Sequence, residues 1–279
     1  MTSTHHSSAL RRALDLGTLA AAGVALTACA SPADAPADDA LQVGIDLTYA
    51  PYAYYEGDSP AGFEVEATTA IAEELGTDAS YQDTRFEQLI PGLNADQFDV
   101  IASALYITPE RAQEVDFIPT FSTGNSIVVA QGSAPLETAA DLCGLVVGVI
   151  KGGDIVNSLR DDASADCTSA GGDAIDVREF PTDPEATQAL LSGQLDAQVT
   201  DAGVASTLDE NGSVAVEITS TELLYPIQVG MAVRKGDADT AERIAEAIAA
   251  LQDSGAWADL LAEYNLSEPD DDALAEILG

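Results

Sequence analysis

Short apolar runs that suit β-strands alternate with amphipathic stretches that suit α-helices along most of the chain after residue 40. The run at residues 41–45 is followed by a helical pattern at residues 64–75, whose apolar positions share one face and which Gly76 ends. The alternation continues through residues 79–84, 86–93 and 100–104. This pattern predicts an α/β protein with parallel sheets.

The same alternation starts again further along the chain. Residues 145–150 are rich in Val and Ile, and Gly193 ends a later helical pattern. We expect strands at residues 145–150, 175–180 and 197–201 and helices at residues 155–161 and 184–192. The pattern therefore predicts two similar α/β units in tandem.

The chain after Glu222 does not begin a third unit. A single strand at residues 227–233 is followed by long amphipathic helices and by an acidic tail at residues 268–279, which we expect to fray. The helices need an existing surface to pack on. A return of the chain to the first unit is the economical solution.

That return defines two expected lobes and a hinge. The first lobe comprises residues 41–130 and 225–279, and the second comprises residues 131–224. The chain would cross between the lobes near residues 126–133 and 224–230. Two crossings at one junction would act as a hinge.

Composition narrows the possible functions. Of the 279 residues, 46% are hydrophobic and 21% are charged, which is the balance of a soluble globular protein. Ten Lys and Arg against 48 Asp and Glu give a net charge of −38, which would repel polyanions and makes nucleic acid an unsuitable partner. The acidic surface suits a salty exterior, and a genomic bias toward Asp and Ala is the alternative explanation.

The first 28 residues have the order of an export signal. Arg11 and Arg12 precede an apolar run at residues 16–26 that is too short to span a bilayer. The sequence Leu-Thr-Ala-Cys that ends at Cys29 resembles the lipobox of bacterial lipoproteins, in which the Cys is lipidated and becomes the new N-terminus. We expect a signal peptide over residues 1–28 and a flexible tether over residues 29–40. A plain secretory leader with a chance Cys is the alternative.

The two other cysteines, Cys143 and Cys167, form an even pair in a chain expected to be exported, so a disulfide is favoured. The loop that such a bridge closes is worth roughly 3.5 kcal/mol in the chain-entropy model. A zinc site would lack further ligands, and a catalytic thiol would lack a His. Both histidines, His5 and His6, lie in the leader, so we expect no metal and no other cofactor.

A series of short motifs follows in order along residues 41–266. Among them are Gly-Phe-Glu-Val-Glu at residues 62–66, Leu-Ile-Pro-Gly-Leu at 89–93, Ile-Thr-Pro-Glu-Arg at 107–111 and Val-Gly-Val-Ile-Lys-Gly-Gly at 147–153. The ordered set resembles the extracellular solute-binding proteins of ABC importers, in the class for polar amino acids. The resemblance implies a two-lobed periplasmic-binding-protein-like fold with two chain crossings at the hinge and a ligand cleft between the lobes. Strand ends and helix starts would face that cleft, where ligands of α/β proteins commonly bind.

The resemblance also implies what the chain does. A lipid-anchored protein on the outer face of the cell membrane would capture a small zwitterionic solute and deliver it to a permease and its ATPase. It would be a monomer, without a cofactor and without enzymatic activity. Two alternatives stay open: a ligand-sensing ectodomain, and an enzyme resembling cyclohexadienyl dehydratase, in which Asp46, Asp154 or Asp201 would act as acid or base.

Two charged residues match ligand-binding positions of the family. Arg111 matches the Arg that holds the ligand carboxylate, a task suited to a planar fork of donors. A surface ion pair with Glu110 or Glu114 is the alternative. Asp201 matches the acid that takes the α-ammonium group, and it could instead cap a helix that starts near Ala202.

Four further positions complete the expected site beside the two charged residues and the aromatic residues. Gly153 and Asp154 join a strand to a helix, so backbone N–H groups there could contact a carboxylate. Family members often carry a hydroxyl residue just after the first Gly of this loop, and this chain departs from that pattern. Ser103 and Ala104, at the end of the strand expected at residues 100–104, are the other two candidates.

The aromatic residues point to a particular ligand. Tyr106 stands where amino-acid binders commonly have a small hydroxyl residue, and Tyr49 and Phe86 align with the walls of the family's site. With Asp46 as an acid, the set resembles the aromatic box of ectoine and hydroxyectoine binders, which holds a delocalised cation. The alternative is that Tyr106 only narrows the cleft for an ordinary amino acid and that Phe86 belongs to the core.

Overall fold

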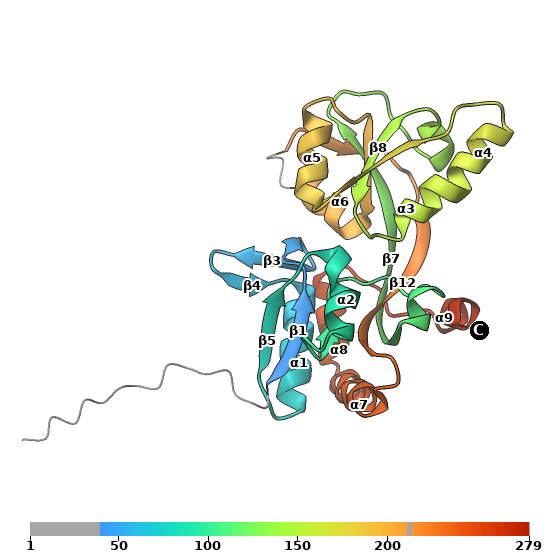
Figure 1. Cartoon of the computed structure of the whole chain (residues 1–279). Coiled ribbons are helices and arrows are strands. Elements are labelled where there is room, and N and C mark those ends of the chain that lie inside the picture. Colours follow the sequence, from blue (N-terminus) through green and yellow to red (C-terminus); the bar gives the residue numbers. More distant parts are fainter. Residues whose placement is uncertain (1–39, 211–213, 279) are drawn as a thin grey trace, which may run out of the picture. The chain divides into compact units, whose positions relative to one another are not determined.

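The computed structural model describes residues 40–210 and 214–278. The expected signal peptide, Cys29 and the tether up to residue 39 lie outside the described residues. Two α/β lobes are joined by two long paired strands, β7 (Val115–Ala130) and β12 (Leu224–Arg234) (Figure 1). This two-lobed α/β architecture confirms the predicted fold class.

One nine-stranded sheet runs through both lobes in the order β5-β1-β6-β12-β7-β10-β8-β9, with β11 beside β7. In the first lobe, β1 (Leu41–Ile45) lies parallel to β5 (Ala79–Asp83) and to β6 (Val100–Ile101). The helices of this lobe are α1 (Phe63–Glu74), α2 (Leu89–Asn94), α7 (Ala238–Ser254) and α8 (Ala256–Glu263).

A small antiparallel sheet lies outside the main one. Its strands are β2 (Thr48–Tyr49), β3 (Ala53–Glu56) and β4 (Ser59–Ala61). The strands are two to four residues long, so the sequence pattern did not indicate them. They fill the connection between β1 and α1.

The second lobe repeats the parallel arrangement. β8 (Val146–Ile150) lies parallel to β9 (Asp176–Phe180) and to β10 (Ala197–Asp201), while β11 (Val216–Ile218) pairs antiparallel with β7. The helices are α3 (Ile155–Asn157), α4 (Ser164–Ser169), α5 (Asp183–Leu191) and α6 (Ala202–Glu210), with a π-helical turn at Ser158–Ala163. In the part of the chain that is described, no helix is both long and apolar enough to cross a bilayer.

The strands between the lobes differ in one respect from expectation. Ser126 already pairs with Thr200 of β10, so the chain reaches the second lobe before the crossing expected at residues 126–133. The return strand β12 begins at Leu224, which pairs with Asn125. The hinge therefore consists of two adjacent antiparallel strands.

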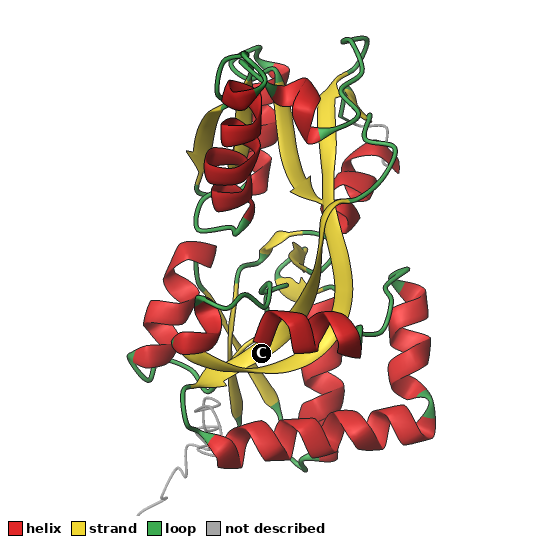
Figure 2. Ribbon diagram, turned by 90° about the vertical axis from the view of Figure 1, so that its right-hand side faces the viewer, coloured by secondary structure: helices red, strands yellow, loops and turns green. Residues whose placement is uncertain are grey.

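The acidic tail is ordered rather than frayed, because it forms α9 (Asp271–Leu278) beside the hinge strands (Figure 2). The backbone N–H of Ser122 donates to the carbonyl of Ser267 at 3.0 Å, and the N–H of Asp270 donates to Gln228 Oε1 at 2.8 Å. Asp270 Oδ1 in turn accepts from the N–H groups of Asp272 and Ala273. The segment before α9 is thus fixed to both hinge strands, and a capping carboxylate starts the helix.

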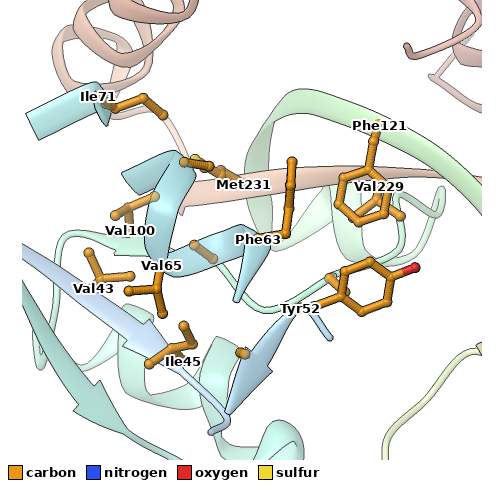
Figure 3. Packing of buried hydrophobic residues seen from close by; sticks show 14 of the residues in the cluster. Val43, Ile45, Tyr52, Phe63, Val65, Ile71, Val100, Phe121, Val229 and Met231 are labelled. Atoms are coloured by element: carbon orange, nitrogen blue, oxygen red, sulfur yellow. The ribbon is translucent and has the colours of Figure 1, made fainter. Parts of the chain in front are cut away.

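The largest core of the first lobe contains an aromatic cluster that reaches the hinge (Figure 3). Phe63 at the start of α1 meets Phe121 of β7 and Trp257 of α8 edge to face, with ring centroids 5.0 and 6.2 Å apart. Phe121 also stacks on Tyr52 at 5.3 Å. Such pairs add to the free energy of burial. The cluster therefore holds Tyr52 firmly in place beside the junction of the lobes.

A disulfide joins Cys143 to Cys167, with the two Cα atoms 5.5 Å apart. This confirms the predicted pairing. The bridge ties the short turn at Ala139–Leu142 to α4 in the second lobe. Cys167 is buried in the core of that lobe, and Cys143 packs against it.

Replacing both cysteines by Ser is expected to lower the free energy of unfolding by about 3.5 kcal/mol, because the unfolded chain regains the entropy of an open loop. Urea unfolding followed by circular dichroism measures the change. The wild-type protein unfolded in dithiothreitol serves as the control and should behave like the double variant. An unchanged midpoint would show that the bridge adds nothing to stability.

Candidate functional site

A pocket lies between the lobes and is lined by residues of both. Its lining residues are Tyr49, Phe86, Ala104, Tyr106, Arg111, Asn125, Ile150, Gly153, Asp154, Ile155, Val199, Thr200 and Asp201. The structure therefore brings together all but two of the residues that the sequence suggested for ligand binding. Their roles toward a ligand stay predictions.

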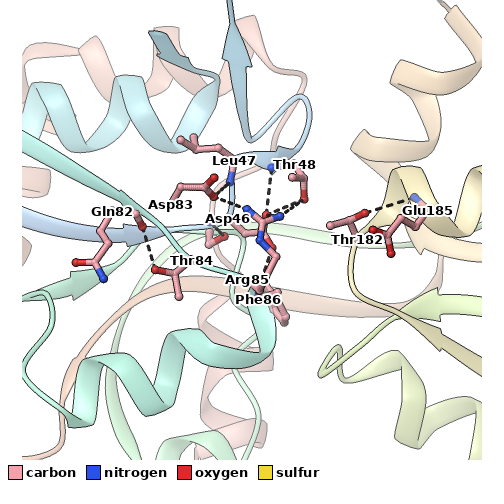
Figure 4. Close-up of polar contacts among 11 residues, drawn as sticks. Asp46, Leu47, Thr48, Gln82, Asp83, Thr84, Arg85, Phe86, Thr182 and Glu185 are labelled. Atoms are coloured by element: carbon pink, nitrogen blue, oxygen red, sulfur yellow. Dashed lines mark hydrogen bonds and ion pairs between the residues drawn. The ribbon is translucent and has the colours of Figure 1, made fainter. Parts of the chain in front are cut away.

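Asp46 and Ser103 are the two that do not line this pocket. Asp46 is buried, and its carboxylate is engaged by the chain itself (Figure 4). Oδ1 pairs with Arg85 at 2.9 Å and accepts from the hydroxyl of Thr48 at 2.7 Å, while Oδ2 accepts from the N–H of Phe86 at 2.8 Å. The hydroxyl of Ser103 accepts from the N–H of Asp46 at 3.0 Å. Asp46 and Ser103 therefore hold the loop that places Phe86 at the side of the pocket.

Arg111 spans the junction between the lobes. One terminal nitrogen donates to the carbonyl of Tyr106 at 2.8 Å, and the other donates to the carbonyl of Gly152, across the cleft, at 2.9 Å. The guanidinium carbon lies 5.6 Å from the centre of the Phe86 ring. Within the described chain, Arg111 makes no ion pair with Glu110 or Glu114. Its further N–H groups are available to a carboxylate, since a guanidinium carries five.

Asp201 ends β10 and is buried at the centre of the site. Oδ1 accepts from the Tyr52 phenol at 2.6 Å and from the N–H of Gly203 at 2.8 Å. Oδ2 accepts from the Tyr106 phenol at 2.7 Å and from the Thr123 hydroxyl at 3.0 Å. The bond to Gly203 caps the start of α6, so the capping role considered for Asp201 is present alongside its place in the pocket.

Burial and hydrogen bonding together set the protonation states of Asp201, Tyr52 and Tyr106. Burial raises the pKa of Asp201, and the hydrogen bonds from Tyr52 and Tyr106 lower it. Burial and the nearby Asp201 charge raise the pKa values of both phenols well above 10, so they remain donors at every physiological pH. The carboxylate is therefore held mainly by neutral groups.

The charges that line the pocket are unbalanced. Arg111 is the basic residue among the lining residues, whereas Asp154 and Asp201 are both acidic. Burial raises the pKa of Asp154, and the Arg111 charge lowers it. A ligand that brings one carboxylate and a larger positive charge complements such a pocket.

The sequence did not indicate several of the residues in and behind the pocket. Ile150 and Thr200 lie at the carboxyl ends of β8 and β10, where the general rule for α/β sheets could have found them. Asn125 lies within the long strand β7, and Tyr52 lies behind the pocket on the first lobe. Nothing local marks either residue, because both become important only through the pairing of the two lobes.

The described residues contain no group of three or more His, Cys, Asp and Glu side chains placed to hold a metal ion. The chemistry that the pocket offers is a guanidinium fork, buried carboxylates, phenols and an apolar wall. These groups suit the binding of a small polar molecule.

Comparisons with known proteins find a family match over most of the chain. The family model described as bacterial extracellular solute-binding proteins, family 3, matches residues 41–267. An L-arginine-binding protein of Pseudomonas aeruginosa is 32% identical over 236 residues, covering 82% of this chain and 88% of the relative. An L-cystine-binding protein of Escherichia coli is 30% identical over 77% of this chain and 78% of its own length. The structure of an ancestral arginine-binding protein bound to arginine is 31% identical, with a TM-score of 0.72 over 81% of this chain and 97% of that one.

Proposed function

This chain belongs to family 3 of the bacterial extracellular solute-binding proteins, and from that membership we propose that it captures a polar amino acid outside the cytoplasmic membrane and passes it to the permease of an ABC importer. One observation carries the proposal: Arg111 and Asp201 line the same pocket, on opposite sides of the junction between the lobes. They are oppositely charged, as the two ends of an amino acid are. The chain is a binding protein and not an enzyme.

The ligand would be oriented by charge. Its α-carboxylate would accept from the open N–H groups of Arg111, and its ammonium group would lie at Asp201. Asp154 adds a second negative charge to the pocket, which favours a ligand with a cationic side chain. The arginine-binding relatives support this choice, and L-arginine therefore heads the ligands to be tested.

Ectoine is retained as the second candidate ligand because Tyr49, Phe86 and Tyr106 all line the pocket. It carries a carboxylate for Arg111 and a delocalised cation for the aromatic rings. Phe86, however, already lies beside the Arg111 guanidinium, so one ring of the expected box has a cation within the protein. This contact favours an amino acid over ectoine.

A thermal-shift panel tests the proposed function. The protein is heated with each of the twenty amino acids, L-cystine, ectoine and glycine betaine. A ligand present at 100 times its Kd adds roughly 2.7 kcal/mol to the free energy of unfolding, which raises Tm by several degrees. We expect a basic amino acid to give the largest shift. A panel in which no compound raises Tm would contradict the proposal.

Tyr106→Phe is expected to tighten the binding of an amino acid by roughly 5-fold, the equivalent of about 1 kcal/mol for one hydrogen bond. The variant keeps the aromatic ring but removes the hydroxyl that donates to Asp201 Oδ2. A ligand ammonium group then no longer has to displace that hydroxyl. Calorimetric titration of both proteins measures the change. Ectoine has no primary ammonium and serves as the control ligand. Weaker amino-acid binding would show instead that the hydroxyl contacts the ligand.

We further propose that Cys29 is lipidated and holds the protein at the membrane. Cys29→Ser is expected to release the protein into the soluble fraction without changing its ligand affinity, because the tether precedes both lobes. Membrane fractionation and a binding assay on the released protein measure both effects. A Cys29→Ser protein that stays with the membrane would contradict the lipoprotein assignment.

A further inference from the structure

We propose that Glu64, which lies behind the pocket wall, is a positioning residue for ligand binding. It holds the backbone of Ala104 in the conformation that receives the ligand, and its ionisation increases the affinity for the ligand. This inference rests on the proposed function of the pocket. Glu64 itself does not line the pocket.

The start of α1 places Glu64 under the wall. Gly62 precedes the helix with φ +106°, and a Cβ there would lie 2.5 Å from the carbonyl oxygen of Pro51. Only glycine permits this close turn. The N–H of Glu64 then donates to the carbonyl of Tyr52 at 2.9 Å, and its side chain is fully buried. The backbone thus fixes the carboxyl group at one position inside the first lobe.

The contact that matters is with Ala104. Glu64 Oε1 accepts from the N–H of Ala104 at 2.7 Å. Ala104 lines the pocket and has φ +46°, a left-handed conformation that a residue with a Cβ adopts only where its surroundings hold it there. Glu64 supplies such a constraint. Since Tyr106 follows two residues later, relaxation of Ala104 would also move the aromatic wall.

The carboxyl group is set to change its charge near neutral pH. Burial raises the pKa of Glu64 to about 7, and the hydrogen bond from Ala104 opposes that rise. In the described chain its second oxygen, Oε2, has no hydrogen-bond partner. The elements packed against α1 are α7, α8, β3, β4 and β5. The titratable group among them that faces Glu64 is Tyr81 of β5, whose pKa the Glu64 charge raises.

The direction of the effect follows from the hydrogen bond. Ionised Glu64 accepts from the N–H of Ala104 more strongly than neutral Glu64 does, because charged acceptors make stronger bonds. Its negative charge also lies behind a pocket expected to receive a cation. The ionised fraction rises between pH 6 and pH 8, so affinity should rise over the same interval. Ligand binding should in turn lower the pKa of Glu64.

The first test needs no ligand. The amide ¹⁵N and ¹H shifts of Ala104 are followed by NMR from pH 5.5 to pH 8.5. We expect them to titrate near pH 7 in the wild-type protein and to stay flat in Glu64→Gln, which keeps the oxygen acceptor but cannot ionise. An Ala104 amide that titrates equally in both proteins would overturn the proposal.

The second test measures affinity with L-arginine, whose carboxylate and guanidinium do not titrate between pH 6 and pH 8. Calorimetry should show roughly 5- to 10-fold tighter binding at pH 8 than at pH 6 in the wild-type protein and less than a twofold change in Glu64→Gln. Asp183→Asn is the matched control. Asp183 is also buried, has an unpartnered oxygen and has its pKa raised to about 6, but it does not line this pocket. Asp183→Asn should keep the dependence on pH.

A further variant separates positioning from general stability. Ala104→Gly removes the Cβ that makes the left-handed backbone costly, so in this background Glu64→Gln should weaken binding less than it does in the wild-type protein. If Glu64→Gln lowers Tm but leaves Kd and its pH profile unchanged, the residue is only structural and the proposal is wrong. If no compound of the thermal-shift panel binds, the proposed function fails and the affinity claim falls with it, while the Ala104 titration still decides whether the contact exists.

Discussion

Arg111→Ala is expected to weaken ligand binding by roughly 30-fold or more, the equivalent of about 2 to 5 kcal/mol. The guanidinium group would be the ligand carboxylate's charged partner, and its loss would leave that carboxylate unpaired in a desolvated pocket. The variant also loses the donor to the carbonyl of Gly152, which links the two lobes at 2.9 Å. Isothermal titration calorimetry with the tightest ligand of the panel measures the effect.

Two further variants make this result specific. Arg111→Lys keeps the charge but not the planar fork, so it should recover only part of the affinity. Arg178→Ala removes an exposed Arg of the second lobe that pairs with Asp176 away from the pocket, and it should change Kd by less than twofold. If Arg111→Ala melts like the wild-type protein and binds within threefold of it, Arg111 does not contact the ligand.

Asp201→Asn is expected to weaken the binding of a primary amine by roughly 30-fold or more, because the amide keeps the volume but loses the charge that would attract the ammonium group. Its NH₂ group would also oppose the donors of Tyr52 or Tyr106, which now approach a carboxylate at 2.6 and 2.7 Å. The effect should be smaller for ectoine, which has no primary ammonium. Calorimetry with both ligands provides the comparison.

Asp183→Asn is again the matched control for this change. Asp183 lies in the same lobe, is equally buried and accepts from Gln198 at 2.8 Å, and it does not itself line the pocket. It should alter Tm more than Kd. An Asp201→Asn protein that binds amino acids as the control does would mean that the ammonium group lies elsewhere, and Asp154 would be the next residue to replace.

Most of the fold could be predicted from the sequence, because apolar residues recur with the period of a strand or of a helix in its main strands and long helices. The strands expected at residues 41–45 and 197–201 are β1 and β10 as observed. The small sheet of β2, β3 and β4 could not be predicted, because two- to four-residue strands carry too little pattern. The helix α9 was missed since its stability depends on contacts with the hinge strands, which are remote in sequence.

The residues of the candidate site also fall into two groups: those that local motifs mark, and those that the fold brings together from distant parts of the chain. The resemblance to the family indicated Arg111 and Asp201, and both residues line one pocket. Asp46 was expected at the ligand, but its carboxylate is engaged by Arg85 and by the N–H of Phe86. No local pattern of the sequence marks Tyr52. Its phenol matters only because another lobe brings Asp201 within 2.6 Å of it.

The attachment of the C-terminal segment to the hinge offers a direct readout of lobe motion. The N–H of Ser122 on β7 is bonded to the carbonyl of Ser267, and the N–H of Asp270 is bonded to Gln228 on β12. Ser122 and Gln228 are paired residues of the two hinge strands, so the C-terminal segment is attached at the point where β7 and β12 would bend together. Amide hydrogen exchange at Ser122 and Asp270 should therefore slow when a ligand holds the lobes together, and a fluorophore or fusion partner placed after α9 would sense the same movement.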